Sequence, residues 1–372
     1  MRLLDKTHIH HIAAGASVLG CGGGGDPHIG KIMALNAIKQ RGRPIELLDL
    51  NVDLDKLHPD ALIVATGMIG SPSVMIEKLP NDSESIEACR FMERYLGKKI
   101  AAIYPIEVGG ANSLLPLATA AHLDVPVIDV DAMGRAFPEF HMTTFYLDGI
   151  NSSPFVLVDS KANICLIQAQ DAYETEKKSR ALCIEMGGIA LFAAYPITPA
   201  VAKASGILGT ISRAQEIGET LEKARNEKAD IVQVLTKLLK GFVLFRGRAN
   251  KIDLRVTGGF TCGLACFDGV DTDKGKTFKV SFQNEYLLAQ CDDLLLCSTP
   301  DLIILLDEDT GVPILAERLR YGSRVVALGV PADKKLCTPQ GLKVTGPQYF
   351  NYDVNFTPVE ELVKANRPLS KP

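Results

Sequence analysis

The stretch that decides how the first half of this chain is interpreted is Leu19-Gly20-Cys21-Gly22-Gly23-Gly24-Gly25-Asp26-Pro27. Consecutive glycines remove the side chains from a run of backbone, so that its N–H groups can turn and converge on a ligand. Asp26 suits an N-cap and Pro27 suits the first helical position, which predicts a helix to about Arg41. Because such a loop before a helix favours anions and polarised carbonyls, the candidate substrate-binding residues are Gly22, Gly23, Gly24 and Gly25.

The loop also contains Gly20-x-Gly22-x-x-Gly25, which has the form of a dinucleotide-binding fingerprint. Such a fingerprint follows a strand, whereas the apolar residues from Thr7 to Leu19 recur at helical spacing. Binding of NAD or FAD is therefore disfavoured. A purely structural tight turn remains an alternative, although four glycines exceed what a turn requires and favour contact with a ligand.

Strands and helices alternate along the first half of the chain. Strands are expected at 44–50, 61–67, 99–105 and 125–129, with helices at 84–96 and 112–123. This pattern predicts an α/β N-terminal domain over residues 1–168, whose parallel or mixed sheet carries helices on both faces in three layers.

The second half of the chain has a different pattern. Residues 169–372 are predicted to form a C-terminal domain that is mostly helical over 172–238. Short strands separated by turns over roughly 240–332 then predict a β-rich, barrel-like core, and residues 333–372 form a C-terminal tail.

Composition excludes several classes of protein. The 372 residues are 47% hydrophobic and 23% charged with a net charge of −4, which is typical of a globular protein and argues against nucleic acid as a partner. No signal peptide or membrane span is recognisable, and nine irregularly spaced cysteines indicate reduced thiols. We therefore expect a cytoplasmic homo-oligomer, without a membrane partner, that acts on a small molecule.

A first candidate site follows the predicted strand at 99–105. Glu107 lies at the carboxyl end of this strand, where open α/β sheets bind ligands, and Gly109-Gly110 permits close approach of a ligand to the backbone. Asn112 is suited either to capping the next helix or to orienting a substrate amide. For Glu107 the alternatives are a functional carboxylate and a helix-capping one.

A second candidate site follows the strand at 125–129. Asp129 and Asp131 alternate along the chain and are expected to share a face, with Arg135 and His141 close behind. Paired carboxylates with an imidazole can hold a divalent metal or position a water molecule. If a metal is present, its expected ligands are Asp129, Asp131, Glu107 and His141. The alternative is an Asp–Arg pair that holds a loop in place.

Cys21 is the one cysteine for which the sequence indicates an active role. The N–H groups of the glycine loop and the following helix are expected to lower the pKa of its thiol, which would suit a nucleophile. A buried, inert thiol is the alternative. His28 follows the same loop and is expected to border the pocket.

Three stretches together resemble a known family: L-G-C-G-G-G-G-D-P-H-I-G from Leu19, E-V-G-G-A-N-S-L-L-P from Glu107, and D-V-D-A-M-G-R-A-F-P-E from Asp129. They resemble the S-methyl-thiohydantoin desulfurase-like family, which is associated with hydantoinases and oxoprolinases. The similarity covers nearly the whole chain and continues through Glu185-Met186-Gly187-Gly188, Phe282-Gln283-Asn284-Glu285, Pro300-Asp301, Arg320-Tyr321-Gly322 and Gly346-Pro347.

The resemblance implies an α/β domain followed by a barrel-like domain, and hydrolysis of a five-membered cyclic ureide in which water displaces a thiol from ring carbon C2. Such a reaction needs a base, donors for developing charge and help for the leaving thiol. The residues expected to serve are Glu107 or Asp129 as base, Asp131 as support, Gly22 to Gly25 as N–H donors, Asn112 and Arg135 to orient the ring, and Cys21 and His28 to shape the pocket. The alternatives are an accessory ligand-binding subunit of a hydantoinase-type system and a nucleotide-dependent oxidoreductase.

Overall fold

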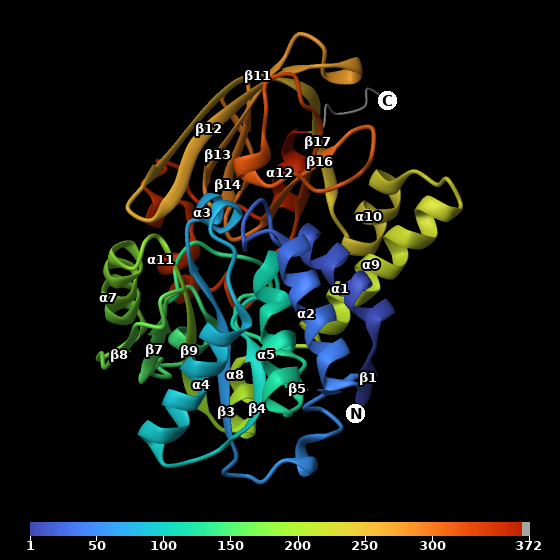
Figure 1. Cartoon of the computed structure of the whole chain (residues 1–372). Helices are drawn as coiled ribbons and strands as arrows, with labels where there is room; N and C mark the ends of the chain where they lie inside the picture. The colour runs from blue at the N-terminus through green and yellow to red at the C-terminus, as the bar shows by residue number, and fades with distance from the viewer. Residues whose placement is uncertain (367–372) are drawn as a thin grey trace.

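The computed structural model describes residues 1–366, which form an α/β part on one sheet and a β part on a second sheet (Figure 1). The first sheet has the strand order β1-β2-β5-β4-β3-β9-β7-β8. Its central strands β2, β5, β4 and β3 are parallel, and antiparallel strands flank them on both sides, so the sheet is mixed. The strands are β1 (Arg2–Leu4), β2 (Ile45–Leu48), β3 (Leu62–Gly70), β4 (Ile100–Pro105), β5 (Val127–Ile128), β7 (Phe155–Val158), β8 (Ile164–Ile167) and β9 (Ile189–Ile197).

Helices cover both faces of this sheet. Along β3, Leu62 and Val64 enter one hydrophobic core, whereas Ile63 and Ala65 enter another on the opposite face. The first core is shared with α1 (Lys6–Leu19), α2 (Pro27–Arg41), α4 (Asp82–Leu96), α5 (Leu115–Leu123), α9 (Thr210–Asn226) and α10 (Ile231–Leu239). The second is shared with α6 (Thr144–Leu147), α7 (Ala172–Glu185) and α8 (Pro199–Ser205). The predicted three-layer arrangement is confirmed.

The second sheet is a curled, fully antiparallel half-barrel with the strand order β15-β14-β13-β12-β11-β17-β16. Its core contains stacked aromatic rings such as Phe245 and Phe278. This confirms the predicted β-rich, barrel-like part. The strands are β11 (Phe242–Thr257), β12 (Phe260–Gly269), β13 (Thr277–Gln283), β14 (Glu285–Cys291), β15 (Leu294–Ser298), β16 (Leu302–Asp307) and β17 (Arg324–Val330).

The remaining elements are short and connect or cover the two sheets. They are α3 (Pro72–Glu77), β6 (Val130–Asp131), β10 (Ile207–Leu208), α11 (Pro339–Thr345) and α12 (Val359–Asn366). The predicted C-terminal tail begins before α11, and its residues 367–372 lie outside the described part of the chain. Among the helices that the structure describes, none combines the length and the apolar character needed to cross a bilayer.

Local sequence signals explain the two helices around the glycine loop. Asp26 accepts a hydrogen bond from the backbone N–H of His28 at 2.8 Å and Pro27 opens α2, so the predicted helix over Pro27–Arg41 is confirmed. The preceding segment is the helix α1, as its periodicity predicts. The glycine pattern therefore follows a helix, and the strand–turn–helix context of a dinucleotide fingerprint is not present.

Two segments differ from the sequence-based expectation. The region 172–238, expected to be mostly helical, also contains β9, which pairs with β3 and β7 in the centre of the first sheet. A short, continuously apolar run does not distinguish a buried strand from a buried helix. In the second sheet, where short strands were expected, residues Phe242–Thr257 form one long strand, β11, because its polar middle segment pairs with β12.

Candidate active site

The glycine loop is the joint between the two sheets. The carbonyl oxygen of Cys21 accepts a hydrogen bond from Tyr286 N at 2.7 Å, and that of Gly22 accepts one from Ala316 N at 2.9 Å. On the other side, Gly24 O accepts from Asn112 N at 3.2 Å. The loop is thus enclosed by backbone from both parts of the chain, which leaves no room for side chains.

Gly23 shows how tight this enclosure is. A Cβ atom placed on Gly23 would lie 1.9 Å from Oε1 of Glu285, the first residue of β14. The neighbouring Gly24 donates its backbone N–H to the same Oε1 atom at 3.0 Å. The loop therefore donates a hydrogen bond to a carboxyl group of the protein itself.

Glu107 approaches the same region from the end of β4. Its Oε1 atom accepts a hydrogen bond from Asn112 Nδ2 at 2.8 Å, and its Oε2 atom accepts one from Phe137 N at 3.0 Å. Asn112 is itself fixed, because its Oδ1 atom accepts from Met68 N at 2.8 Å and its Nδ2 atom also donates to Met68 O at 3.2 Å. Asn112 thus orients Glu107 and does not cap a helix.

Glu107 and Glu285 form a buried pair of acids. Burial raises the pKa of Glu107 to about 7, although the hydrogen bonds from Asn112 and Phe137 and the charge of Arg135 oppose this shift. Burial, together with the charge of Glu107, raises the pKa of Glu285 well above its usual range. Because like charges at one buried site do not both ionise near neutrality, the pair retains one proton there.

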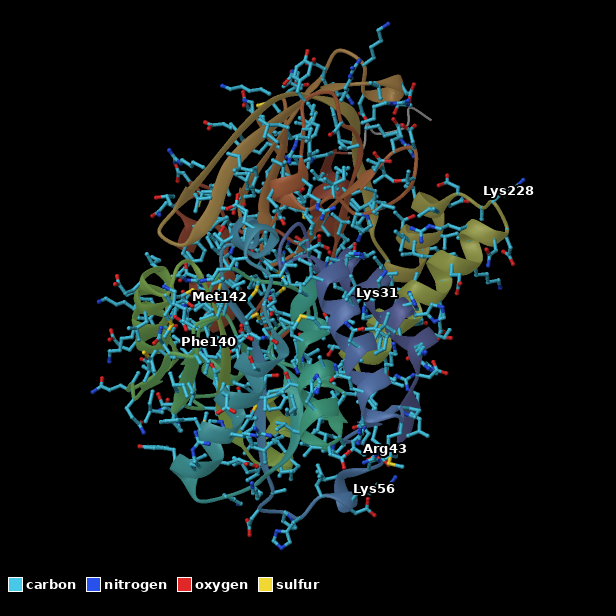
Figure 2. All side chains as sticks on the ribbon, in the orientation of Figure 1. Lys31, Arg43, Lys56, Phe140, Met142 and Lys228 are labelled. Atoms are coloured by element: carbon cyan, nitrogen blue, oxygen red, sulfur yellow. The ribbon has the colours of Figure 1, made fainter. Side chains whose placement is uncertain are left out.

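Both acids line a small cavity of about 50 Å³ at the joint. Its walls combine apolar side chains, such as Met68, Ile106 and Phe192, with polar and charged ones. Phe140, labelled in Figure 2, also lines it and packs edge-on against Phe192 with 5.3 Å between ring centroids. The Oε2 atom of Glu285 is buried and has no hydrogen-bond partner among residues 1–366. Buried polar groups that converge on a cavity mark it as a candidate small-molecule site.

Arg180 of α7 lines the opposite side of the cavity. Its Nε atom donates to Glu176 Oε1 at 2.7 Å, its Nη2 atom donates to Pro138 O at 2.9 Å, and its guanidinium lies 4.1 Å from the centroid of the Phe260 ring. These contacts fix the side chain, while its Nη1 atom is buried without a partner in the described part of the chain. Arg180 therefore has one N–H donor, at Nη1, that is held in a fixed position and has no partner among residues 1–366.

The sequence did not single out Arg180 or Glu285 as site residues. Glu285 stands in the stretch Phe282-Gln283-Asn284-Glu285, which contributed to the family resemblance without suggesting a role. Arg180 lies in an ordinary amphipathic helix whose periodicity predicts only burial or exposure. Both come near Glu107 through contacts between segments far apart in the chain.

Arg135 was expected to orient a substrate, but its side chain is fully buried between the two sheets. Its Nη1 atom donates to the carbonyl oxygens of Pro300 at 3.1 Å and Asp301 at 2.7 Å, and its Nη2 atom donates to that of Tyr286 at 3.2 Å. Arg135 therefore joins the two sheets through hydrogen bonds. Its positive charge also opposes the rise in the pKa values of Glu107 and Glu285.

Asp129 and Asp131 do not form one site, because each carboxylate has its own hydrogen-bond partners. Asp129 lies between β5 and β6 and accepts hydrogen bonds from Ile211 N at 2.8 Å and Ser212 N at 3.2 Å, so it caps α9. Asp131 accepts from Val108 N at 2.8 Å and so supports the loop that carries Glu107. Burial raises the pKa of Asp131 to about 8.

The metal site considered from the sequence is not assembled. His141 is buried against the rings of Tyr146, Tyr173 and Tyr349, and burial lowers its pKa to about 4. Across residues 1–366, no three His, Cys, Asp or Glu side chains are placed to hold a metal ion. Glu107, Asp129, Asp131 and His141 each have a separate set of contacts.

Cys21 and His28 also differ from expectation. Cys21 is fully buried and its Sγ atom faces Leu19 O at 3.5 Å. Burial raises the pKa of its thiol to about 11, so the expected lowering is wrong: the cost of burying the thiolate outweighs the charge of Arg135 and a hydrogen bond from the backbone of Ile303. His28 is exposed and lines a different groove, beside His10 and His11.

The fold and the site define a protein of two parts whose joint carries a buried acid pair in a small cavity. The chain belongs to the S-Me-THD-like family: the model of its N-terminal domain matches residues 7–169, and that of its C-terminal domain matches residues 169–359. This is the S-methyl-thiohydantoin desulfurase-like family that the sequence motifs resemble.

Comparison with individual proteins adds evidence on the fold. Among curated proteins, none matches this chain. A crystal structure of a protein from Chromobacterium violaceum is similar over 96% of this chain and 100% of that chain, with a TM-score of 0.78 and 21% sequence identity. At this identity the likeness shows that the fold is shared, and nothing more.

The buried acids make stability depend on pH. Burial raises the pKa to about 7 for Glu107, about 8 for Asp131, about 6 for Asp301 and about 7 for Glu317. The folded chain keeps these protons at pH values where the unfolded chain, with carboxyl pKa values near 4, has lost them. We therefore expect the free energy of unfolding to fall by on the order of a few kcal/mol between pH about 5 and about 8.

Urea unfolding across this pH range measures the effect. The Glu317→Gln variant should show a shallower fall, because it removes one of the contributing groups. A free energy of unfolding that rises steadily toward pH about 8 would contradict the burial of these acids.

Proposed function

We propose that this protein is a hydrolase that acts on a small cyclic ureide, and specifically that it replaces the methylthio group at C2 of an S-methylated thiohydantoin ring with oxygen from water, releasing a thiol. The observation that carries this proposal is the Glu107–Glu285 pair, two acids with raised pKa values that line one small cavity. General acid–base catalysis near neutral pH requires groups of this kind. Membership of the family supports the choice of substrate class.

The two acids have different tasks in this proposal. Glu285, with the higher pKa, holds the shared proton, and ionised Glu107 takes a proton from water as the water oxygen bonds to C2. Glu285 gives its proton to the ring nitrogen. When the C2–S bond breaks, the new hydroxyl proton passes to Glu285 and Glu107 protonates the leaving thiolate. The products are a hydantoin and a thiol, and both acids return to their starting states.

The other polar groups of the cavity bind and orient the ring. Asn112 holds Glu107 in place through its 2.8 Å hydrogen bond. Arg180 Nη1 donates to a ring carbonyl oxygen and stabilises the negative charge that develops when water attacks. Burial of these groups lowers the local dielectric constant and so strengthens both interactions.

Substitution of Arg180 tests its role. Arg180→Lys keeps the positive charge but loses the forked donor geometry, so we expect kcat/KM to fall by about 10- to 100-fold. Lys178→Met on the same helix is the matched control, because Lys178 is half-exposed and pairs only with Glu174 among the described residues. If the Arg180→Lys variant and the wild type have the same kcat/KM, Arg180 does not bind the substrate.

The function itself is tested with the purified protein alone. We expect a panel of S-methylated thiohydantoins to yield free thiol with multiple turnovers. Tight binding of the intact ring without thiol release would instead favour an accessory subunit of a hydantoinase-type system.

We further place this activity in the cytoplasm. All nine cysteines are free thiols, and burial raises the pKa of several of them, Cys89 and Cys297 among them, which makes them slow to oxidise.

A further inference from the structure

The long strand β11 has an edge without a partner. It pairs with β17 only from Phe242 to Arg248, whereas its pairing with β12 continues to Thr257. Among residues 1–366, the segment 251–257 therefore has a neighbouring strand on one side alone. We call this segment, Lys251-Ile252-Asp253-Leu254-Arg255-Val256-Thr257, the free edge.

The free edge combines exposed apolar and charged side chains in strict alternation. Leu254 and Val256 on one face are 38% and 55% exposed. Asp253 and Arg255 on the other face are also exposed. An exposed edge with apolar side chains is a template for pairing with another strand.

The order of these residues is self-complementary. If two copies pair antiparallel about a two-fold axis at Leu254, Asp253 of each copy faces Arg255 of the other. In the same register Ile252 faces Val256 and Leu254 faces itself. Opposite charges and apolar pairs stabilise directly opposed positions of an antiparallel pair.

Neighbouring registers lack this match. An axis at Asp253 places Asp253 against itself and Lys251 against Arg255, and an axis at Arg255 places Arg255 against itself. Like charges in directly opposed positions are destabilising. We propose that the free edge is the interface of a homodimer, formed by antiparallel pairing of the two β11 strands about Leu254.

The proposed interface adjoins the candidate active site but does not depend on its chemistry. The β11–β12 hairpin runs along the margin of the second sheet and turns above α7 (Figure 1). Just beyond this turn, Phe260 packs on Arg180 at 4.1 Å. The hairpin that carries the free edge therefore contacts a residue that lines the cavity.

The mass in solution, measured by light scattering after size exclusion, tests the proposal. We expect the wild type to have twice the mass of one 40.2 kDa chain. Asp253→Arg places arginine against Arg255 of the partner, and Arg255→Asp places aspartate against Asp253. Each variant alone should therefore have the mass of one chain.

Mixing the two single variants restores the complementarity, because one copy then carries two arginines and the other two aspartates. We expect the mixture to return to the dimer mass, which also shows that both variants are folded. Lys228→Glu is the control, since Lys228 lies on the opposite side of the molecule from the hairpin turn (Figure 2) and should leave the dimer intact. A monomeric wild type, or single variants that remain dimeric, would overturn the proposal.

Discussion

Replacing Glu285 by glutamine is expected to lower kcat for thiol release by about 100- to 10,000-fold, the range that a positioned acid or base contributes. Glutamine keeps the oxygen that accepts the N–H of Gly24, and its amide occupies the position of Oε2, which has no partner among the described residues. The variant should therefore fold normally. It loses only the proton that the pair shares.

The pH profile distinguishes this loss from a structural effect. In the wild type, kcat/KM should rise with pH as Glu107, with a pKa of about 7, ionises, and fall at higher pH as Glu285 loses its proton. In Glu285→Gln the residual activity should lose the falling limb. Because Glu285 is still protonated and uncharged at the pH where Glu107 ionises, the rising limb should keep its position in this variant.

Glu317→Gln is the matched control for this experiment. Glu317 is also a buried glutamate of the second part, and burial raises its pKa to about 7, but it does not line the cavity. We expect its kcat to equal that of the wild type. Equal losses in Glu285→Gln and Glu317→Gln would show that any buried charge change impairs the protein, and would contradict a specific role for Glu285.

Replacing Arg135 by methionine should lower the free energy of unfolding by about 3–5 kcal/mol, as expected when one partner of a buried charged cluster is removed. The change leaves the carbonyl oxygens of Tyr286, Pro300 and Asp301 without the donors that they have in the wild type. It also removes the positive charge that opposes the raised pKa values of Glu107 and Glu285. Urea unfolding at neutral pH measures the loss.

Two further variants make this prediction specific. Arg324→Met removes a half-exposed arginine that pairs with Glu308 at 2.8 Å, and should cost far less than Arg135→Met. Arg135→Lys keeps the charge but reaches fewer carbonyl oxygens, so its loss should lie between the other two. If Arg135→Met and Arg324→Met have the same free energy of unfolding, the hydrogen bonds of Arg135 do not stabilise the packing of the two sheets.

The parts of this fold that could be predicted from sequence depend on local signals. Asp26 and Pro27 start α2 through contacts within one helical turn, and the apolar periodicity from Thr7 predicts α1. The strand β9 was missed because it is apolar on both faces, and its partners β3 and β7 are distant in the chain.

The site could be predicted only in part for the same reason. Glu107 and Asn112 lie five residues apart at the end of one strand, so their proximity follows from the local pattern. Glu285 and Arg180 reach the cavity only after the two sheets have packed together, and nothing in their immediate sequence marks them. Asp129 was misinterpreted because the strand breaks at this residue, and its carboxylate then caps a helix that begins far along the chain, at Thr210.

The measurement that tests the central claim most directly is hydrolysis of an S-methylated thiohydantoin in isotopically labelled water, followed by mass spectrometry of the ring. With the wild type we predict one thiol released for each ring converted, and labelled oxygen at C2 of the hydantoin. The Glu285→Gln variant should leave the ring largely unconverted over the same period. Release of thiol without labelled oxygen in the ring, or recovery of unconverted S-methylated substrate from the wild type, would contradict the proposed chemistry.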